Sequence, residues 1–214
     1  MKHPLQVSLG LEAEKSGMPS KGRGRLVALG AGSVVVLLVL LYSLGAFAGP
    51  QATSGGTTTT ATSYAVSAAS VIASAGAHVP DGYAQGQPHQ LSPRESGLDS
   101  GGYAVFSTQG GAIANMTILV FDSPQSAQAY IQSVIGNAKG LSGYTDITAV
   151  LSSYQHYGVC YGFGQSDPYG NGAVATGVCT KGNVYIQVHD VSPSLSSAKA
   201  EMSDLVGAAY QGAG

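Results

Sequence analysis

The alternation of apolar and polar residues predicts a series of strands in the C-terminal two thirds of the chain. Short runs rich in Val, Ile and aromatic residues, bounded by Gly, Pro, Asn and Ser, are typical of strands. They occupy residues 103–107, 114–121, 144–152, 155–164, 172–180 and 183–190. The stretch 76–102 is rich in Gly, Pro, Ser and Gln, so we expect it to be irregular.

A different spacing, with apolar residues three and four positions apart, predicts helices after two of these strands. Ser123 and Pro124 supply an N-cap and a first-turn proline for one helix, and Ser192 and Pro193 do so for the last one. Residues 63–75 predict a third, short helix. The order ββ-α-ββββ-α then predicts an α+β fold, in which an antiparallel sheet carries its helices on one face.

Residues 26–48, LVALGAGSVVVLLVLLYSLGAFA, contain no charged side chain. A helix of this length reaches about 34 Å and a bilayer core is about 30 Å thick, so the segment predicts a single transmembrane helix. Basic residues precede the segment and none follows nearby, which places the N-terminus in the cytoplasm. The predicted parts are a cytoplasmic tail (1–25), the transmembrane helix (26–48), a flexible Gly/Ser/Thr-rich linker (49–63) and an extracytoplasmic domain (64–214).

Cleavage of the hydrophobic segment is the alternative to a permanent anchor. The small-x-small sequence ending at Ala48 fits a signal-peptide cleavage site, and Met18 would then be a suitable start. The apolar run is longer than the core of an ordinary signal peptide, which favours the anchor. Gly45 and Gly49 form a GxxxG motif that permits two such helices to approach closely, so the segment also allows a homodimer.

Charge and motif content exclude several functions. Beyond residue 48 the chain has four Lys and Arg residues against nine Asp and Glu residues, whereas nucleic-acid binding requires clustered basic side chains. The sequence lacks Gly-x-Ser-x-Gly and His-Glu-x-x-His motifs, and its acidic residues are scattered singly. We therefore expect no nucleic-acid partner, no catalysis and no cofactor.

The only two cysteines, Cys160 and Cys179, lie on neighbouring predicted strands joined by the turn-forming segment SDPYGNG. A hairpin that bends between Tyr169 and Gly170 places them directly opposite each other, with Cα atoms about 4.5–5.5 Å apart. In an extracytoplasmic domain such a pair should be oxidised, so we predict a disulfide. Free thiols are the alternative; a metal or redox site is disfavoured because Cys-x-x-Cys spacing and a nearby His pair are missing.

The length of the next turn decides which face the last strand presents, because a shift of one residue exchanges the two faces. A three-residue loop at 181–183, with Gly182 or Asn183 in the left-handed conformation, places Val184, Ile186 and Val188 with the other large apolar residues. We choose this loop because it gives one consistent core. The disulfide then lies on the face away from the helices.

Three polar residues of the last strand, Tyr185, Gln187 and His189, are the candidate ligand-binding residues. In the chosen register they border the disulfide face, which is paved with Gly and Ala and allows close approach of a ligand. A phenol, an amide and an imidazole are groups that orient bound molecules. The competing interpretation is that residues 76–102 simply cover this face.

The last part of the sequence consists of a Cys-bearing strand, a tight turn, a second strand and a terminal amphipathic helix (GVCTKGNVYIQVHDVSPSLSSAKAEMSDLVGAAY). A similar step from strand to helix occurs earlier, at the segment DSPQSAQAY. They resemble the extracytoplasmic sensor-like domains of actinobacterial receptor kinases and related lipoproteins. The resemblance implies ligand sensing without catalysis. A tail of 25 residues leaves no room for a cytoplasmic kinase, so a binding or accessory role is expected.

We therefore predict a membrane-anchored extracytoplasmic binding or sensor-like module without catalytic activity. Its partner is expected to be an unidentified ligand or protein of the cell envelope. A structural component of the envelope is the alternative, and an unrecognised enzyme comes third.

Overall fold

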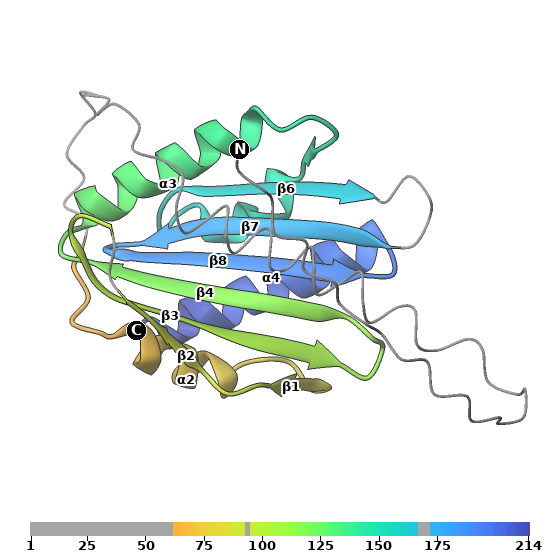
Figure 1. Ribbon diagram of the computed structural model, residues 1–214, viewed down its shortest axis with the longest axis horizontal. Helices are drawn as coiled ribbons and strands as arrows, with labels where there is room; N and C mark the ends of the chain where they lie inside the picture. Colours follow the sequence, from red (N-terminus) through yellow and green to blue (C-terminus); the bar gives the residue numbers. More distant parts are fainter. Residues whose placement is uncertain (1–61, 93–94, 167–171) are drawn as a thin grey trace, which may run out of the picture.

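A computed structural model describes residues 62–92, 95–166 and 172–214 of the chain. This part contains an eight-stranded antiparallel sheet with strand order β1-β3-β4-β8-β7-β6-β5, in which β2 also pairs with β3 (Figure 1). The strands are β1 (Tyr83–Gln85), β2 (His89–Leu91), β3 (Leu98–Thr108), β4 (Ile113–Phe121), β5 (Thr145–Asp146), β6 (Cys160–Ser166), β7 (Ala173–Lys181) and β8 (Val184–Ser192). The helices are α2 (Ala68–Gly76), α3 (Pro124–Lys139), α4 (Leu195–Gly212) and the 3-10 helix η1 (Thr148–Tyr154).

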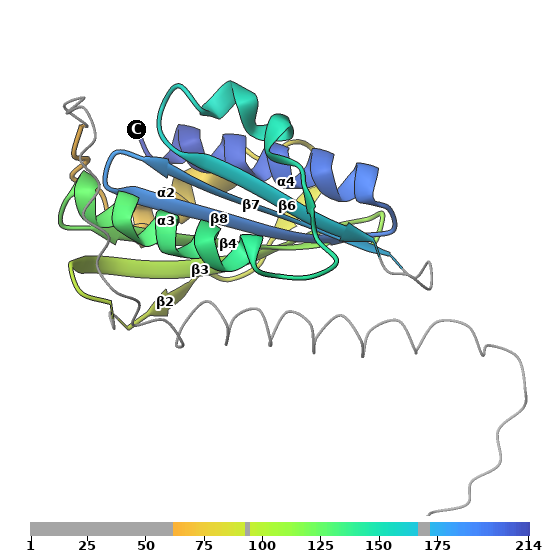
Figure 2. The ribbon, with the colours of Figure 1, turned by 90° about the horizontal axis from the view of Figure 1, so that it is seen from above.

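The antiparallel α+β fold agrees with the sequence, but the helices lie on both faces of the sheet rather than on one (Figure 2). On one face, helices α2 and α4 share a core with residues such as Met116 and Ile186. On the other, Ile131 of α3 packs with Leu119 and Tyr185. We call these the α4 face and the α3 face. A sheet covered on both sides has apolar residues at successive positions, so alternation alone did not reveal the second layer.

Serine caps begin the three α-helices of the described residues, as the first-turn chemistry predicts. Ser123 accepts a hydrogen bond from the backbone N–H of Ser126 at 3.2 Å, and Pro124 is the first residue of α3, as predicted. For α4 the predicted cap was wrong, because Ser194 caps the helix and Ser192 ends strand β8 instead. The shift leaves the Ser192 hydroxyl available for side-chain contacts.

Two segments differ from the sequence prediction. The stretch 76–102, expected to be irregular, contains β1, β2 and the start of β3. Strands β1 and β2 have three residues each, mostly exposed, and they are held by backbone pairing with β3. The segment 144–152, expected to be a strand, forms the two-residue β5 and most of η1. Neither segment offers the apolar alternation of a longer strand.

The register of the β6–β7 hairpin is the one predicted, with Cys160 paired to Cys179. These residues form a disulfide with a Cα–Cα distance of 4.2 Å. The three-residue loop before β8 was wrong: Lys181 pairs with Val184, so the loop has two residues. Gly182 takes the left-handed conformation with φ +58°, a conformation that glycine adopts without strain at the first position of a two-residue hairpin loop.

The one-residue difference exchanges the two faces of β8. The disulfide now lies on the α4 face, where the Tyr210 hydroxyl is 3.5 Å from the Cys160 sulfur. The small residues beside it permit close helix packing: a Cβ atom on Gly177 would lie 2.3 Å from Met202 Sδ and 3.2 Å from Leu151 Cδ1. The face expected to be open to a ligand is therefore covered mainly by α4 and η1, and Val79 and Tyr83 from the stretch 76–102 also pack against this core.

Asn183 explains why the loop adopts this register. Its amide oxygen accepts a hydrogen bond from the Tyr64 backbone N–H at 2.6 Å, and its amide nitrogen donates to the carbonyls of Phe121 at 2.8 Å and Tyr64 at 3.2 Å. The side chain is buried. It thereby joins the start of the domain to β4 and to the β7–β8 turn.

The predicted cytoplasmic tail, the transmembrane helix at 26–48 and almost all of the linker lie outside the described residues. Within 62–92, 95–166 and 172–214, no helix has both the length and the hydrophobicity needed to cross a bilayer.

Candidate functional site

The three predicted binding residues all lie on the α3 face: Tyr185 lies beside helix α3, and Gln187 and His189 lie in two neighbouring rows that cross the sheet. One row consists of Tyr103, Thr117, Gln187, Val178 and Tyr161, and its neighbour of Val105, Asn115, His189, Thr176 and Phe163. The polar central positions are Thr117 and Gln187 in the first row and Asn115, His189 and Thr176 in the second, and each row has an aromatic or valine side chain at both ends. We call them the polar rows. Helix α3 packs on the adjoining part of this face, around Leu119, Tyr185 and Val178.

Tyr185 belongs to the α3 core rather than to an open surface. Its ring is 1% exposed and makes an edge-on contact with the ring of Tyr130 at a centroid distance of 4.9 Å. Its hydroxyl donates a hydrogen bond of 2.8 Å to the side-chain oxygen of Gln187. Tyr185 therefore positions the Gln187 amide, while Gln187 itself is half-buried at the border of the polar rows.

His189 lies in the middle of the second polar row. Its Nδ1 atom is 2.8 Å from the hydroxyl of Thr176, and the side chain is 4% exposed. The Nε2 atom is buried and has no hydrogen-bond partner in the described part of the chain. Buried polar atoms are nearly always paired, and an unpaired one requires an explanation such as a functional role.

The polar rows carry no formal charge at neutral pH. Burial lowers the pKa of His189 to about 4, so the imidazole is neutral. Its neighbours Asn115, Thr117, Thr176 and Gln187 are uncharged hydrogen-bonding residues. The polar rows therefore combine hydrogen-bond donors and acceptors with no formal charge.

Sequence analysis found the residues of β8 and missed those of the strands on either side. Asn115, Thr117 and Thr176 are buried at 6%, 9% and 2% exposure, in strands taken as core. The signal was present: Asn115 and Thr117 alternate with Met116 and Ile118, which marks one polar face. The ligand-binding role of Tyr185, Gln187 and His189 stays a prediction.

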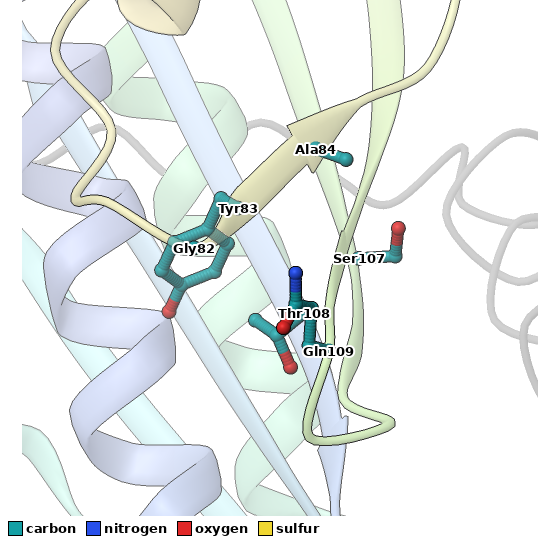
Figure 3. Close-up of a pocket in the computed structure, with 6 residues that line it drawn as sticks. All are labelled: Gly82, Tyr83, Ala84, Ser107, Thr108 and Gln109. Carbon is teal, nitrogen blue, oxygen red and sulfur yellow. The ribbon is translucent and has the colours of Figure 1, made fainter.

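A second candidate region lies at the end of the sheet on the α4 face. A depression of about 430 Å³ is lined by the side chains of Asp81, Tyr83, Thr108, Gln109 and Glu201, with glycines between them. An adjoining hollow of about 300 Å³ shares Tyr83, Thr108 and Gln109 with it (Figure 3). Figure 3 shows Tyr83 projecting from β1 toward helix α4, with Thr108 and Gln109 on the β3–β4 hairpin.

Carboxyl groups surround one side of this depression. The Ser192 hydroxyl lies 2.5 Å from Asp190 Oδ1 and also contacts Glu201 Oε2. A hydroxyl donates only one proton, so both contacts are hydrogen bonds only if one carboxyl is protonated. Burial raises the pKa of Asp190 to about 7; the hydrogen bond from Ser192 opposes this rise and the nearby Glu201 adds to it.

Two polar atoms of this region have no hydrogen-bond partner among the described residues. They are Asp190 Oδ2 and the hydroxyl oxygen of Tyr83. Burial and the carboxylates of Glu201, Asp204 and Asp190 raise the pKa of Tyr83, so its phenol stays protonated. Nowhere in the described ranges do three His, Cys, Asp or Glu side chains converge in a way that could hold a metal ion.

Comparison with known proteins gives a weak likeness among solved structures. No protein-family model matches the chain, and no curated protein matches it. Among solved structures, the chain is similar to the extracellular domain of PknH from Mycobacterium tuberculosis, with 12% sequence identity and a TM-score of 0.45. The match covers 68% of this chain and 92% of that one. The weak resemblance to sensor-like domains of actinobacterial kinases, inferred above from short sequence segments, is thereby confirmed.

Proposed function

We propose that this protein is a non-catalytic, extracytoplasmic binding module that takes a neutral, hydroxyl-rich ligand on its polar rows. The observation that supports this most is the Nε2 atom of the buried His189, which has no hydrogen-bond partner among the described residues. An unsatisfied buried polar group costs about 1–3 kcal/mol, and a ligand that supplies its hydrogen bond recovers that cost. The chain places this atom among uncharged polar side chains.

The composition of the polar rows indicates the class of ligand. Amide, hydroxyl and neutral imidazole groups in the centre match the hydroxyl groups of a ligand. The ends carry the aromatic rings of Tyr103, one face of which stacks on His89, and of Phe163. Both aromatic residues are half-buried, and Val105 beside them is 36% exposed, so the rows open to solvent at their ends. A few placed polar groups beside aromatic surface are typical of small-molecule sites. A saccharide combines the two matching properties.

A panel of neutral mono- and disaccharides, titrated into the full chain in a neutral detergent, tests this proposal. Binding to the native state raises its apparent stability and shifts backbone amide resonances of β4, β7 and β8. Gln187→Ala is expected to weaken the affinity about tenfold, because one hydrogen bond of roughly 1.4 kcal/mol is lost. Tyr185→Phe keeps the packed ring and removes the hydroxyl that orients Gln187, so a smaller loss is expected.

Gln132→Ala, at an exposed position of α3, is the matched control and should leave the affinity unchanged. If a saccharide binds but neither Gln187→Ala nor Tyr185→Phe alters its affinity, the polar rows are not the site. If none binds and the protein cross-links into arrays with its own copies, the structural role in the envelope replaces the proposal.

The proposed position of the domain, outside the cytoplasm and anchored to the membrane, rests on three features of the sequence and the fold. They are the uncharged segment 26–48, the basic residues before it and the disulfide between Cys160 and Cys179. Disulfides persist in oxidising compartments outside the cytoplasm, and the basic flank orients a single span with its C-terminal side outside. We propose that the span is retained as an anchor, and a homodimer through Gly45 and Gly49 belongs to the same proposal.

Protease added to intact cells is expected to remove the domain while leaving an N-terminal fragment in the membrane. The fragment should contain residues 26–48 and react with an antibody against an N-terminal tag only after the cells are opened. Protection of residues 64–214 in intact cells would contradict the topology. A secreted domain beginning near Gly49 would instead show that the segment is a cleaved signal peptide.

A further inference from the structure

We propose that a group of tyrosine side chains at one end of the domain rests on the headgroup region of the outer membrane leaflet and holds the domain in one orientation. The group consists of Tyr64, Tyr154, Tyr157 and Tyr210, and we call it the tyrosine cluster. The inference rests on one part of the proposed function, the retention of residues 26–48 as a membrane anchor. It is independent of any ligand on the polar rows.

The chain enters the domain beside the tyrosine cluster. Residues 49–61 join the predicted span to the first described residue. Tyr64 lies over the β7–β8 turn, where a Cβ atom on Gly182 would be 2.8 Å from its ring. The start of the described chain, this turn and the C-terminal end of α4 lie at the same end of the sheet (Figure 1, Figure 2). A flexible linker of about a dozen residues has an r.m.s. reach of about 20 Å, so a bilayer that holds the span is the nearest partner for this end.

The four rings form one connected group around Lys181. The Tyr210 ring stacks with that of Tyr154 at a centroid distance of 5.1 Å and contacts that of Tyr157 at 5.4 Å. The Lys181 Nζ atom lies 5.2 Å from the centroid of Tyr64 and 5.9 Å from that of Tyr157. It also donates a hydrogen bond of 2.9 Å to the Tyr210 carbonyl. Because an ammonium group attracts aromatic rings, Lys181 fixes the rings on either side of it.

Tyr157 is the ring of the cluster that reaches solvent most fully. Its side chain is 52% exposed, while its inner side contacts Tyr210 and Lys181. The imidazole of His156 lies beside it at a centroid distance of 3.7 Å. A tyrosine has an apolar ring and a polar hydroxyl, and this combination favours the boundary between lipid and water. The cluster therefore presents to the bilayer a side chain that suits its headgroup region.

The small size of the exposed surface favours a lipid surface over a protein partner. A stable protein interface buries about 800 Å² on each partner, far more than one strongly exposed ring provides. A tethered membrane contact requires less, because a short flexible linker gives an effective concentration in the mM range. A contact with an intrinsic dissociation constant of about 1 mM is then formed about half of the time.

A single tryptophan at position 157 tests the contact. The chain has no tryptophan, so Tyr157→Trp introduces the only one, in a residue type that also favours the interface. The full chain is reconstituted into phosphatidylcholine vesicles with or without bromine atoms on the acyl chains close to the headgroup. Bromine quenches tryptophan only at short range, so the emission should fall by about half in the brominated vesicles. Gln109→Trp is the control, because Gln109 is exposed on the β3–β4 hairpin at the other end of the sheet, and its emission should not change.

A second variant tests the side chain itself. With a paramagnetic headgroup lipid in the vesicles, the wild-type amide resonances of residues 157 and 182 should broaden and those of 109 and 110 should not. A contact that is about tenfold weaker is formed about a tenth of the time, so Tyr157→Ser should reduce the broadening about fivefold. Leu141→Ser is the matched control, since Leu141 is 41% exposed but follows the far end of α3, and it should leave the broadening unchanged.

Four results would overturn the inference. They are equal quenching at positions 157 and 109, no quenching at either position, broadening that Tyr157→Ser leaves unchanged, and cross-linking of two copies through position 157 without quenching, which would assign the cluster to a second copy of the chain. The protease experiment on intact cells decides the anchor separately. A retained span with an unquenched Trp at position 157 rejects the membrane contact alone, whereas cleavage near Ala48 rejects both the contact and the anchor.

Discussion

Replacing Cys160 and Cys179 by alanine is expected to lower the free energy of unfolding by about 3 kcal/mol. The disulfide closes a loop with a sequence separation of 19, and in the chain-entropy model a loop of about this size stabilises the folded state by roughly 3 kcal/mol. Both cysteines are buried in the core beneath α4, so removal of the bond also loosens packing there. Urea titration of the full chain in detergent, followed by tyrosine fluorescence, measures the loss.

A reducing agent provides the matched control. It should destabilise the wild-type chain by a similar amount and leave the double variant unchanged. Because the disulfide lies on the α4 face and the polar rows on the α3 face, the variant should still bind a saccharide under conditions where it is folded. Two reactive thiols in protein purified from its native envelope, without reduction, would contradict the bond.

The disulfide register was predictable because several local signals agree. Turn-forming residues, two cysteines equidistant from the bend and β-rich flanks all specify one hairpin, and the structure has Cys160 opposite Cys179. The start of α3 was predictable for the same kind of reason, since Ser123 and Pro124 define a helix N-terminus chemically. Local chemistry determines features of this kind.

The face of β8 was not predictable in the same way. A single-residue change in the turn exchanges its faces, and both faces of β8 are buried: Ile186 and Val188 pack beneath α4, and Tyr185 packs beneath α3. A search for one apolar face therefore finds two acceptable registers. The decisive contacts, from Asn183 to Tyr64 and Phe121, join residues far apart in the sequence, so they appear only once the chain has folded.

The candidate site also contains some residues that the local sequence pattern reveals and others that only the folded sheet brings together. The residues of β8 were recognisable as a set of polar groups on alternate positions, whichever face they occupied. Their partners Asn115 and Thr176 come from β4 and β7, and only the sheet order brings them beside His189. The depression at Tyr83 was not predictable, because β1 is a three-residue strand without an apolar pattern.

Two adjacent residues of β8 are expected to give the protein opposing responses to pH. The pKa of His189 is lowered by burial to about 4 from its ordinary value of 6.5. Between these values the unfolded chain binds the proton more tightly, so the contribution of His189 to stability is complete above pH 6.5 and declines as the pH falls toward 4. The full change is on the order of 3 kcal/mol.

Asp190 works in the opposite direction. Its pKa is raised by burial to about 7 from 3.8, so the folded chain binds the proton more tightly between these values. The contribution of Asp190 is complete below about pH 4 and is lost as the pH rises toward 7. Each group changes the free energy of unfolding by at most about 1.4 kcal/mol per pH unit, with opposite signs, so the two responses largely cancel between pH 4 and 6.5.

Single substitutions should therefore expose the response of the remaining group. With Asp190→Asn, the free energy of unfolding measured relative to wild type should increase between pH 4.5 and 6.5, by about 1 kcal/mol or more per pH unit. With His189→Asn, which keeps a side-chain oxygen near the hydroxyl of Thr176, the same difference should decrease over this interval. Altered packing shifts a whole curve and leaves its slope, so the slope is the quantity to compare. Parallel curves for wild type and both variants would show that neither group titrates as its burial requires.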